Sequence, residues 1–278
     1  MFIRYYSEET KRRCFKERET GKMNLGKTLR IMVLIVAATA LAAASARACG
    51  GTMHIFISEL AIDYVKDPAL KKLIDENRNF LLWGSWFPDS GYAVGNQYGE
   101  FAHWTPFLNT YGDYIRNDVT PANSDYDKLV AHYLGASSHS MADQLFDHIF
   151  LAKTEEIEGT GQEQLDSGLD LVCMKKNGRY RVRIADEVYA NPAIYTPINH
   201  IANVFARLDT GYRDVKTQMY NGQNALALAI KGEMMVSALQ YRMLRHDYPW
   251  STKNYYNAPG GIVRNFIVFE RDGKDDAK

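Results

Sequence analysis

Helical spacing of apolar residues dominates this 278-residue sequence and predicts a protein built chiefly of α-helices. Two observations support this prediction. Apolar side chains recur at steps of three and four along most of the chain, whereas a single short segment has the features of paired strands. The composition, with 46% hydrophobic and 24% charged residues, is that of an ordinary globular protein rather than of a disordered or fibrous one.

Residues 1–48 have the features of an export signal. A basic segment precedes a run of 14 apolar and small residues, Ile31 to Ala44. That run is too short to span a bilayer, which needs about 20 residues. The small-x-small triplet that ends at Ala48 predicts cleavage before Cys49, with a lipoprotein signal as the alternative. A start at Met23 would leave a signal of ordinary length, and either start predicts a periplasmic or secreted protein.

The mature chain is expected to form one domain, residues 49–270, followed by a charged tail, 271–278. Residues 49–278 carry 23 Lys and Arg against 29 Asp and Glu, a net charge of −6, although the whole chain is neutral. This excess of acid gives no general basis for binding nucleic acid. Export would place Cys49 and Cys173 in an oxidising compartment, where they could pair.

Helices are expected from the start of this domain onward. Apolar spacing predicts one from His54 to Lys66, and Asp67-Pro68 then breaks it and begins another. The spacing of Ser124 and Asp127 is like that of a capping box. The apolar pattern that follows, 129–151, predicts a long helix of about 25 residues.

The segment 79–109 is expected to be loop-like, because glycine and proline interrupt it repeatedly. It is also rich in aromatic residues, and long irregular segments of compact domains tend to be functional. Its aromatic side chains could line the mouth of a lipid-binding cleft, or most of them could be core residues; they are Trp83, Trp86, Phe87, Tyr92 and Trp104.

Further helices are expected at 192–208, which Pro192 opens, and at 214–246, where an apolar stripe indicates a core-facing side. The exception to helical spacing is 172–184, which could form a short hairpin around its Asn-Gly dipeptide.

Histidines beside carboxylates mark the candidate chemistry. His139 and Asp143 are four residues apart on the long helix, so their side chains share one face. Asp147 extends that face, and His148 lies beside it. A helix that holds imidazole and carboxylate one turn apart suits a divalent cation. A surface ion pair or a buried structural histidine would give the same spacing, so the pair alone leaves both interpretations open.

Three features outside the helix favour the metal. The aromatic segment supplies Asp89 and His103, and the new N-terminus supplies His54, five residues after Cys49. A freed α-amino group, whose pKa is ordinarily about 8, can itself bind a metal once it is deprotonated.

Six short motifs that occur in order between Cys49 and Leu151 resemble the catalytic domain of glycosylphosphatidylinositol-specific phospholipase D and, more distantly, the bacterial zinc-dependent phospholipases C. They are Cys49-Gly50-x-x-x-His54, Phe87-Pro88-Asp89, His103-Trp104-Thr105-Pro106-Phe107-Leu108-Asn109, Tyr114-Ile115-Arg116, Lys128-Leu129-Val130-Ala131 and Ser138-His139-x-x-Ala142-Asp143. The resemblance implies an all-α fold, a single helical domain around a multinuclear zinc site.

The resemblance also implies the ligands of two zinc ions. Cys49 would bind one zinc through its backbone amine and carbonyl, together with His54. His103 and His139 would hold a second zinc, and Asp143 would bridge the two.

A catalytic carboxylate and a third zinc follow from the same resemblance. Asp89 would bind metal or take a proton from the attacking water. For the third zinc, Asp147 and His148 compete for one position and Asp166 supplies another. Gln162 stands where the family has histidine, so the third zinc is expected to be weakly held or absent.

The function these features predict is an exported zinc-dependent phosphodiesterase that hydrolyses phospholipids or lipid-anchored phosphoesters by metal-activated water. Transient contact with a membrane surface is expected, without nucleic acid or an obligate protein partner. The alternatives are a zinc phosphodiesterase of the single-strand nuclease type and a zinc-binding exported protein that has lost turnover.

Overall fold

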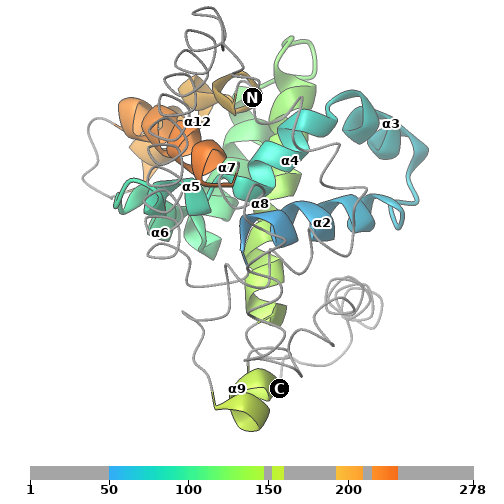
Figure 1. Ribbon diagram of the computed structural model, residues 1–278. Helices are drawn as coiled ribbons and strands as arrows, with labels where there is room; N and C mark the ends of the chain where they lie inside the picture. The colour runs from blue at the N-terminus through green and yellow to red at the C-terminus, as the bar shows by residue number, and fades with distance from the viewer. Residues whose placement is uncertain (1–49, 147–151, 160–191, 209–214, 231–278) are drawn as a thin grey trace, which may run out of the picture.

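A computed structural model describes residues 50–146, 152–159, 192–208 and 215–230 (Figure 1). The helices in chain order are α2 (Gly51–Ile62), α3 (Pro68–Glu76), α4 (Arg78–Trp86), α5 (Asp89–Tyr92), α6 (Tyr98–Ala102), α7 (Thr105–Asp118), α8 (Tyr126–Phe146), α9 (Ala152–Glu158), the 3₁₀ helix η4 (Pro192–Tyr195) and α12 (Ile198–Arg207). Residues 215–230 are also helical. Within these ranges no strand occurs, so the all-α prediction is confirmed.

Helix α8 runs through the middle of the described structure, and α4 packs closely along it (Figure 1). Their backbones touch at Gly84, where a Cβ atom would lie only 2.1 Å from the carbonyl oxygen of His132. This close approach brings the segment that follows α4, which carries Asp89, beside the helix that carries His139.

Two clusters of buried apolar residues hold the helices together. One joins α2 and α4 to α8, from Ala131 to Phe146, around the fully buried Trp83 and Trp86. The other joins α6, α7 and α12 to the first turns of α8, around Phe107 and Phe205. Burial of large side chains like these contributes about 1.5–3 kcal/mol each to folding. Helices from both clusters supply the histidines and aspartates of the site.

The first two helices differ in extent from the prediction. Helix α2 begins at Gly51 and ends at Ile62, earlier than the expected 54–66. The chain must leave the helix before Asp67, because this residue is extended and its carboxylate caps α3, accepting hydrogen bonds from the N–H groups of Ala69 (2.8 Å) and Leu70 (3.1 Å). The break predicted at Asp67-Pro68 is confirmed.

The prediction of a loop-like segment at 79–109 is wrong. These residues form most of α4, the single turns α5 and α6, and the start of α7. Pro88 and Gly95 lie between helices, whereas Gly84, Gly91 and Gly99 lie within them. Helices α5 and α6 are shorter than the length that periodicity detects. The two single turns pack tightly, since a Cβ atom on Gly91 would lie 2.3 Å from the backbone nitrogen of Gly99.

Later segments agree with the prediction where they are described. The long helix begins at Tyr126, and its expected end at 151 lies outside the described residues. The helix expected at 192–208 is divided into η4 and α12, because Pro197 disfavours helical geometry at the residue before it. The predicted hairpin at 172–184 lies outside the described residues.

No helix in the described part of the chain is both long and apolar enough to cross a bilayer.

Candidate metal centre

Five side chains from four helical segments converge between the two apolar clusters. They are His54 of α2, Asp89 at the start of α5, His103 directly after α6, and His139 and Asp143 of α8. All five residues are buried, with exposed fractions from 0% to 9%. The sequence predicted each of them as a metal ligand, and the structure places them together; their roles remain predictions.

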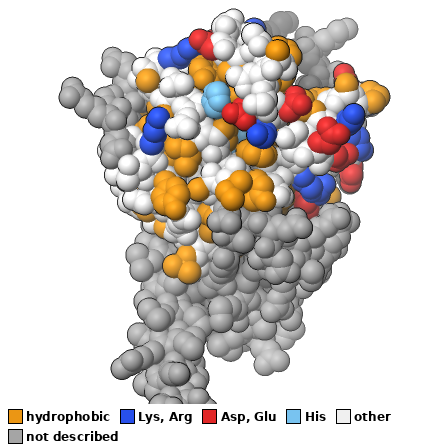
Figure 2. Space-filling model, turned by 90° about the horizontal axis from the view of Figure 1, so that it is seen from above, with side chains coloured by type: hydrophobic (Ala, Val, Ile, Leu, Met, Phe, Trp, Pro, Cys, Tyr) orange, Lys and Arg blue, Asp and Glu red, His pale blue; other side chains and the backbone are white. Residues whose placement is uncertain are grey.

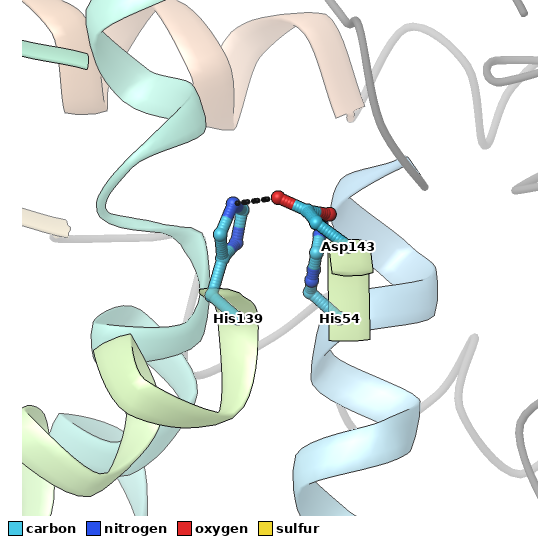
Figure 3. Close-up of side chains that lie close together, drawn as sticks. All are labelled: His54, His139 and Asp143. Carbon is cyan, nitrogen blue, oxygen red and sulfur yellow. Dashed lines mark ion pairs between the residues drawn. The ribbon is translucent and has the colours of Figure 1, made fainter. Parts of the chain in front are cut away.

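The carboxylate of Asp143 faces three imidazoles. Its Oδ1 atom lies 3.1 Å from Nε2 of His54, and its Oδ2 atom lies 3.2 Å from Nε2 of His139. Nε2 of His103 is 3.7 Å from Oδ2. Figure 3 shows this carboxylate beside His54 and His139, which reach it from different helices. Asp143 is thus the group that two neighbouring cations could share.

Asp89 faces the same three imidazoles. Its oxygens lie 3.5 Å from Nε2 of His103, 3.8 Å from Nε2 of His139 and 3.9 Å from Nε2 of His54. These separations are longer than hydrogen bonds between nitrogen and oxygen ordinarily are. Asp89 therefore faces the three nitrogens without a short hydrogen bond to any of them, whereas Asp143 lies close to two of them.

Backbone carbonyl groups orient two of the imidazoles. Nδ1 of His139 lies 2.8 Å from the carbonyl oxygen of Ser85, and Nδ1 of His103 lies 2.6 Å from that of Gly99. If each Nδ1 carries the proton and donates it to the carbonyl, Nε2 presents its lone pair to the centre, as metal-binding histidines usually do. Nε2 of His139 is buried and lies 3.2 Å from Oδ2 of Asp143 and 3.8 Å from Oδ1 of Asp89, so it faces both carboxylates of the centre.

The pKa shifts of both aspartates and of His139 suit a cation, whereas that of His103 favours a proton in the metal-free state. Burial by itself would raise the pKa of Asp89 and of Asp143, but the charges and hydrogen bonds of the surrounding histidines outweigh it and lower both. Burial and the neighbouring charge of His54 lower the pKa of His139. The pKa of His103 is raised despite burial, because Asp89 and Asp143 face it. Anionic carboxylates and a neutral imidazole are the forms that bind metal.

The donor atoms form two overlapping groups whose members lie within 4.8 Å of one another. One group is His54, His139 and Asp143, and the other is Asp89, His103 and His139. The rings of His54 and His139 stack with centroids 3.6 Å apart. Nitrogen and carboxylate donors without thiolate fit zinc in sites that keep positions open for water and substrate. The residues present therefore fit zinc.

The other predicted ligands lie outside the described residues. They are Cys49, the expected N-terminal donor, and the candidates for a third zinc, Asp147, His148 and Asp166. These four assignments remain predictions.

The aromatic residues of the segment 79–109 have two kinds of environment. Trp83, Trp86 and Phe87 are fully buried and belong to the core. Tyr92 and Trp104 instead flank His103, with ring centroids 5.1 and 6.5 Å from the imidazole. The side chain of Trp104 is 52% exposed, so it forms part of the outer edge of the site.

Sequence reasoning missed three groups around the centre. The carbonyls of Ser85 and Gly99 belong to the backbone, and no residue pattern identifies them. Glu100 accepts hydrogen bonds from the Tyr92 hydroxyl (2.6 Å) and the Trp104 indole (2.9 Å). Trp104 lies beyond the end of α6 with an extended backbone, so no helical spacing identifies its pairing with Glu100.

Comparisons with known proteins agree with this geometry. Residues 53–222 match the zinc dependent phospholipase C family. The phosphatidylinositol-glycan-specific phospholipase D of Bos taurus is 38% identical over 106 residues, which are 34% of this chain and 13% of that protein. The enzyme of the same name from Mus musculus is 33% identical over 117 residues, covering 38% of this chain and 14% of the relative.

The human protein of that name is 34% identical over 106 residues, again 34% of this chain and 13% of the relative. The match thus covers only about an eighth of the length of these relatives. No solved structure gives a significant match. The family match includes all five converging residues and more than half of the sequence, and it shows that the chain belongs to the zinc-dependent phospholipase C family.

Proposed function

We propose that this protein is a zinc-dependent hydrolase that cleaves phosphodiesters of phospholipids or of lipid anchors with water. The observation that carries the proposal is the convergence of three imidazoles and two carboxylates in one buried centre, within a chain of this family. A phosphodiester is anionic and repels nucleophiles, so its hydrolysis needs a site that gathers positive charge. The relatives, named for their action on phosphatidylinositol glycan, support a lipid-linked substrate.

Each of the five residues has a role in this proposal. His54 borders one zinc position, His103 and His139 hold a second with Asp89 beside it, and Asp143 lies between the two. Zinc bound there would neutralise charge on the phosphodiester and lower the pKa of a bound water towards about 7. Two ions are proposed, and the candidates for a third lie outside the described residues.

Asp89 is proposed to orient the attacking water. The imidazoles lower its pKa despite burial, so the carboxylate stays ionised and accepts a hydrogen bond from water at neutral pH. Its distance of 3.5 Å from Nε2 of His103 supports a role beside the second zinc position. Asp89 thereby acts on the water rather than on the lipid.

The surroundings of the site support contact with a lipid surface. Trp104 is 52% and Phe101 38% exposed, and both are close in sequence to His103. Exposed aromatic side chains of this kind favour the boundary between water and lipid. Membrane contact would be transient, through these side chains, and no obligate protein partner is proposed. The proposal includes export, with residues 1–48 as the signal, 49–270 as the catalytic domain and 271–278 as a tail.

The alternative of a nuclease receives less support. Figure 2 shows one face of the molecule on which the described acidic and basic side chains lie close together rather than in separate areas of one sign. A polyanion binds best to a continuous basic surface. The net charge of −6 in residues 49–278 points the same way.

A parallel assay tests the proposal. The purified, zinc-loaded protein is given phosphatidylinositol vesicles, a soluble diester such as bis(p-nitrophenyl) phosphate, and single-stranded DNA. We expect release of the lipid head group, loss of activity with a chelator and recovery with added zinc. Whether phosphate leaves with the head group decides between C-type and D-type cleavage. Asp89→Asn should lose most turnover while zinc stays bound.

His200→Gln is the matched control, because this histidine contacts Tyr114 and Asp125 instead of the centre. It should keep full activity. Zinc binding without turnover of any substrate would refute the proposal and favour a binding protein, whereas turnover of DNA alone would favour the nuclease.

A further inference from the structure

Glu100 joins two aromatic side chains beside the metal centre. Its Oε2 atom accepts a hydrogen bond from the hydroxyl of Tyr92 at 2.6 Å, and its Oε1 atom accepts one from the indole N–H of Trp104 at 2.9 Å. Glu100 itself is exposed to solvent. A carboxylate that uses one oxygen for each of two aromatic donors fixes both rings in place, and hydrogen bonds to a charged acceptor are stronger than neutral ones.

Both donors stand next to candidate metal ligands. Tyr92 lies one helical turn after Asp89, at the other end of α5, and Trp104 directly follows His103. The ring of Tyr92 is 5.1 Å from the imidazole of His103. Glu100 also follows Gly99, whose carbonyl contacts Nδ1 of that imidazole. The carboxylate therefore connects the helix that carries Asp89 with the residues on either side of His103.

The two helices need such a connection. Helix α5 has four residues and α6 has five, far below the length at which an isolated helix is stable. Contacts between them include the close approach of Gly91 to Gly99, a buried hydrogen bond of 2.8 Å between the hydroxyls of Ser90 and Tyr98, and the hydrogen bond from Tyr92 to Glu100. Burial and the Glu100 carboxylate raise the pKa of Tyr92, so its hydroxyl stays protonated and remains a donor.

We propose that Glu100 is a positioning residue for the half of the metal centre formed by Asp89 and His103, and that it acts through Tyr92 and Trp104. It holds α5 against α6 and thereby keeps the carboxylate of Asp89 3.5 Å from Nε2 of His103. Its expected effect on turnover rests on the proposed function, but its expected effect on zinc affinity does not.

The test is a mutational cycle with two readouts. Glu100→Ala is made alone and in the background of the double variant Tyr92→Phe/Trp104→Phe, which keeps an aromatic ring at each position and loses both donors. Glu100→Gln, which keeps a single acceptor oxygen, is made beside them. Zinc affinity is measured by competition with a chelator, and kcat and KM are measured on phosphatidylinositol vesicles. Thermal melting and circular dichroism verify that each variant folds.

Glu100→Ala is expected to lower zinc affinity about tenfold, as loss of groups that orient metal ligands commonly does. It should lower kcat more than it raises KM. The Tyr92→Phe/Trp104→Phe variant should reproduce most of this loss, and adding Glu100→Ala to it should then change little, because groups that act through one another are not additive. Glu100→Gln should give an intermediate loss. Glu76→Ala removes another exposed glutamate, paired with Lys72, and should change neither readout.

Two outcomes would overturn the proposal. If Glu100→Ala lowers the melting temperature but leaves zinc affinity and kcat unchanged, the carboxylate only stabilises the fold. If its full effect persists in the Tyr92→Phe/Trp104→Phe background, Glu100 acts directly rather than through the two rings. Failure of the wild-type protein to hydrolyse any diester would instead refute the proposed function, and the zinc titrations would still decide the role of Glu100.

Discussion

His132 should make the metal-free protein sensitive to mild acid, and His132→Leu should remove much of that sensitivity. The imidazole is fully buried on α8, with Phe87 and Tyr111 against it, and its Nε2 atom has no hydrogen-bond partner within the described ranges. Burial lowers its pKa to about 3. The unfolded chain has an ordinary histidine pKa of about 6.5.

The sign and size of the effect follow from this difference. As the pH falls, the histidine binds a proton at a higher pH in the unfolded chain than in the folded protein. His132 therefore costs no stability above pH about 6.5, and the free energy of unfolding decreases as the pH falls from there towards about 3. A pH of about 4.5 lies about two units below the pKa of the histidine in the unfolded chain. Each unit corresponds to about 1.4 kcal/mol of stability. The expected loss between neutral pH and pH about 4.5 is therefore about 3 kcal/mol for this residue alone.

Urea denaturation of the metal-free wild type and of His132→Leu at both pH values measures this loss. The wild type should lose about 3 kcal/mol more than the variant. Tyr111→Phe serves as control, because it removes the hydroxyl that lies 3.3 Å from Nδ1 of His132 but leaves the imidazole buried. It should keep the acid sensitivity. Equal losses in wild type and His132→Leu would show that burial does not hold the imidazole neutral, and the reasoning would fail.

Three other predictions concern the site and its supports. Asp143→Asn removes the charge that faces His54 and His139 at 3.1 and 3.2 Å. Zinc affinity, measured with a competing chelator, should therefore fall about 100-fold, or about 3 kcal/mol. An unchanged affinity would exclude Asp143 as a ligand. Gly84→Ala places a Cβ atom 2.1 Å from the His132 carbonyl oxygen. It should destabilise the protein by about 3 kcal/mol in urea denaturation, and zinc should bind more weakly if α4 moves away from α8. Asp67→Ala should cost about 1 kcal/mol by loss of the α3 cap while zinc affinity stays the same, which distinguishes local from site effects.

The parts of the fold that depend on local signals were predictable from the sequence. The cap and break at Asp67-Pro68 act within one helical turn, and the structure has α3 where they predict it. The long helix α8 has a sustained apolar pattern, and it begins within three residues of the expected position. The all-α class and the family were predictable for the same reason, since both depend on long patterns and ordered motifs.

The segment that carries Asp89 was predicted wrongly because its order comes from tertiary contacts. Helices α5 and α6 are too short for any periodic signal, and they are held by the approach of Gly91 to Gly99 and by packing against longer helices. A single sequence shows the glycines but not what approaches them. The same limit explains the misplaced start of α2, which packs with α4 and α8.

The candidate ligands were easier to predict than the groups that orient them. Histidine and aspartate carry their chemistry in the side chain, so His139 and Asp143 could be found from their spacing. The carbonyls of Ser85 and Gly99, which contact the histidine Nδ1 atoms, are the same in every residue type. Which carbonyl lies beside which imidazole appears only once the neighbouring segments are placed.

This difference has a consequence for how the centre can be altered. A change at His139 or Asp143 removes a donor, whereas a change at Gly84 or Glu100 leaves every donor present and alters only where it lies. Because a metal site tolerates little displacement of its ligands, about 0.5 Å in well-ordered centres, both kinds of change should weaken zinc binding. They should differ in their response to excess zinc. High zinc should recover the part of the turnover that Glu100→Ala loses through weaker binding, since its ligands are intact, but should leave Asp143→Asn far less active, because the missing charge is also needed once zinc is bound.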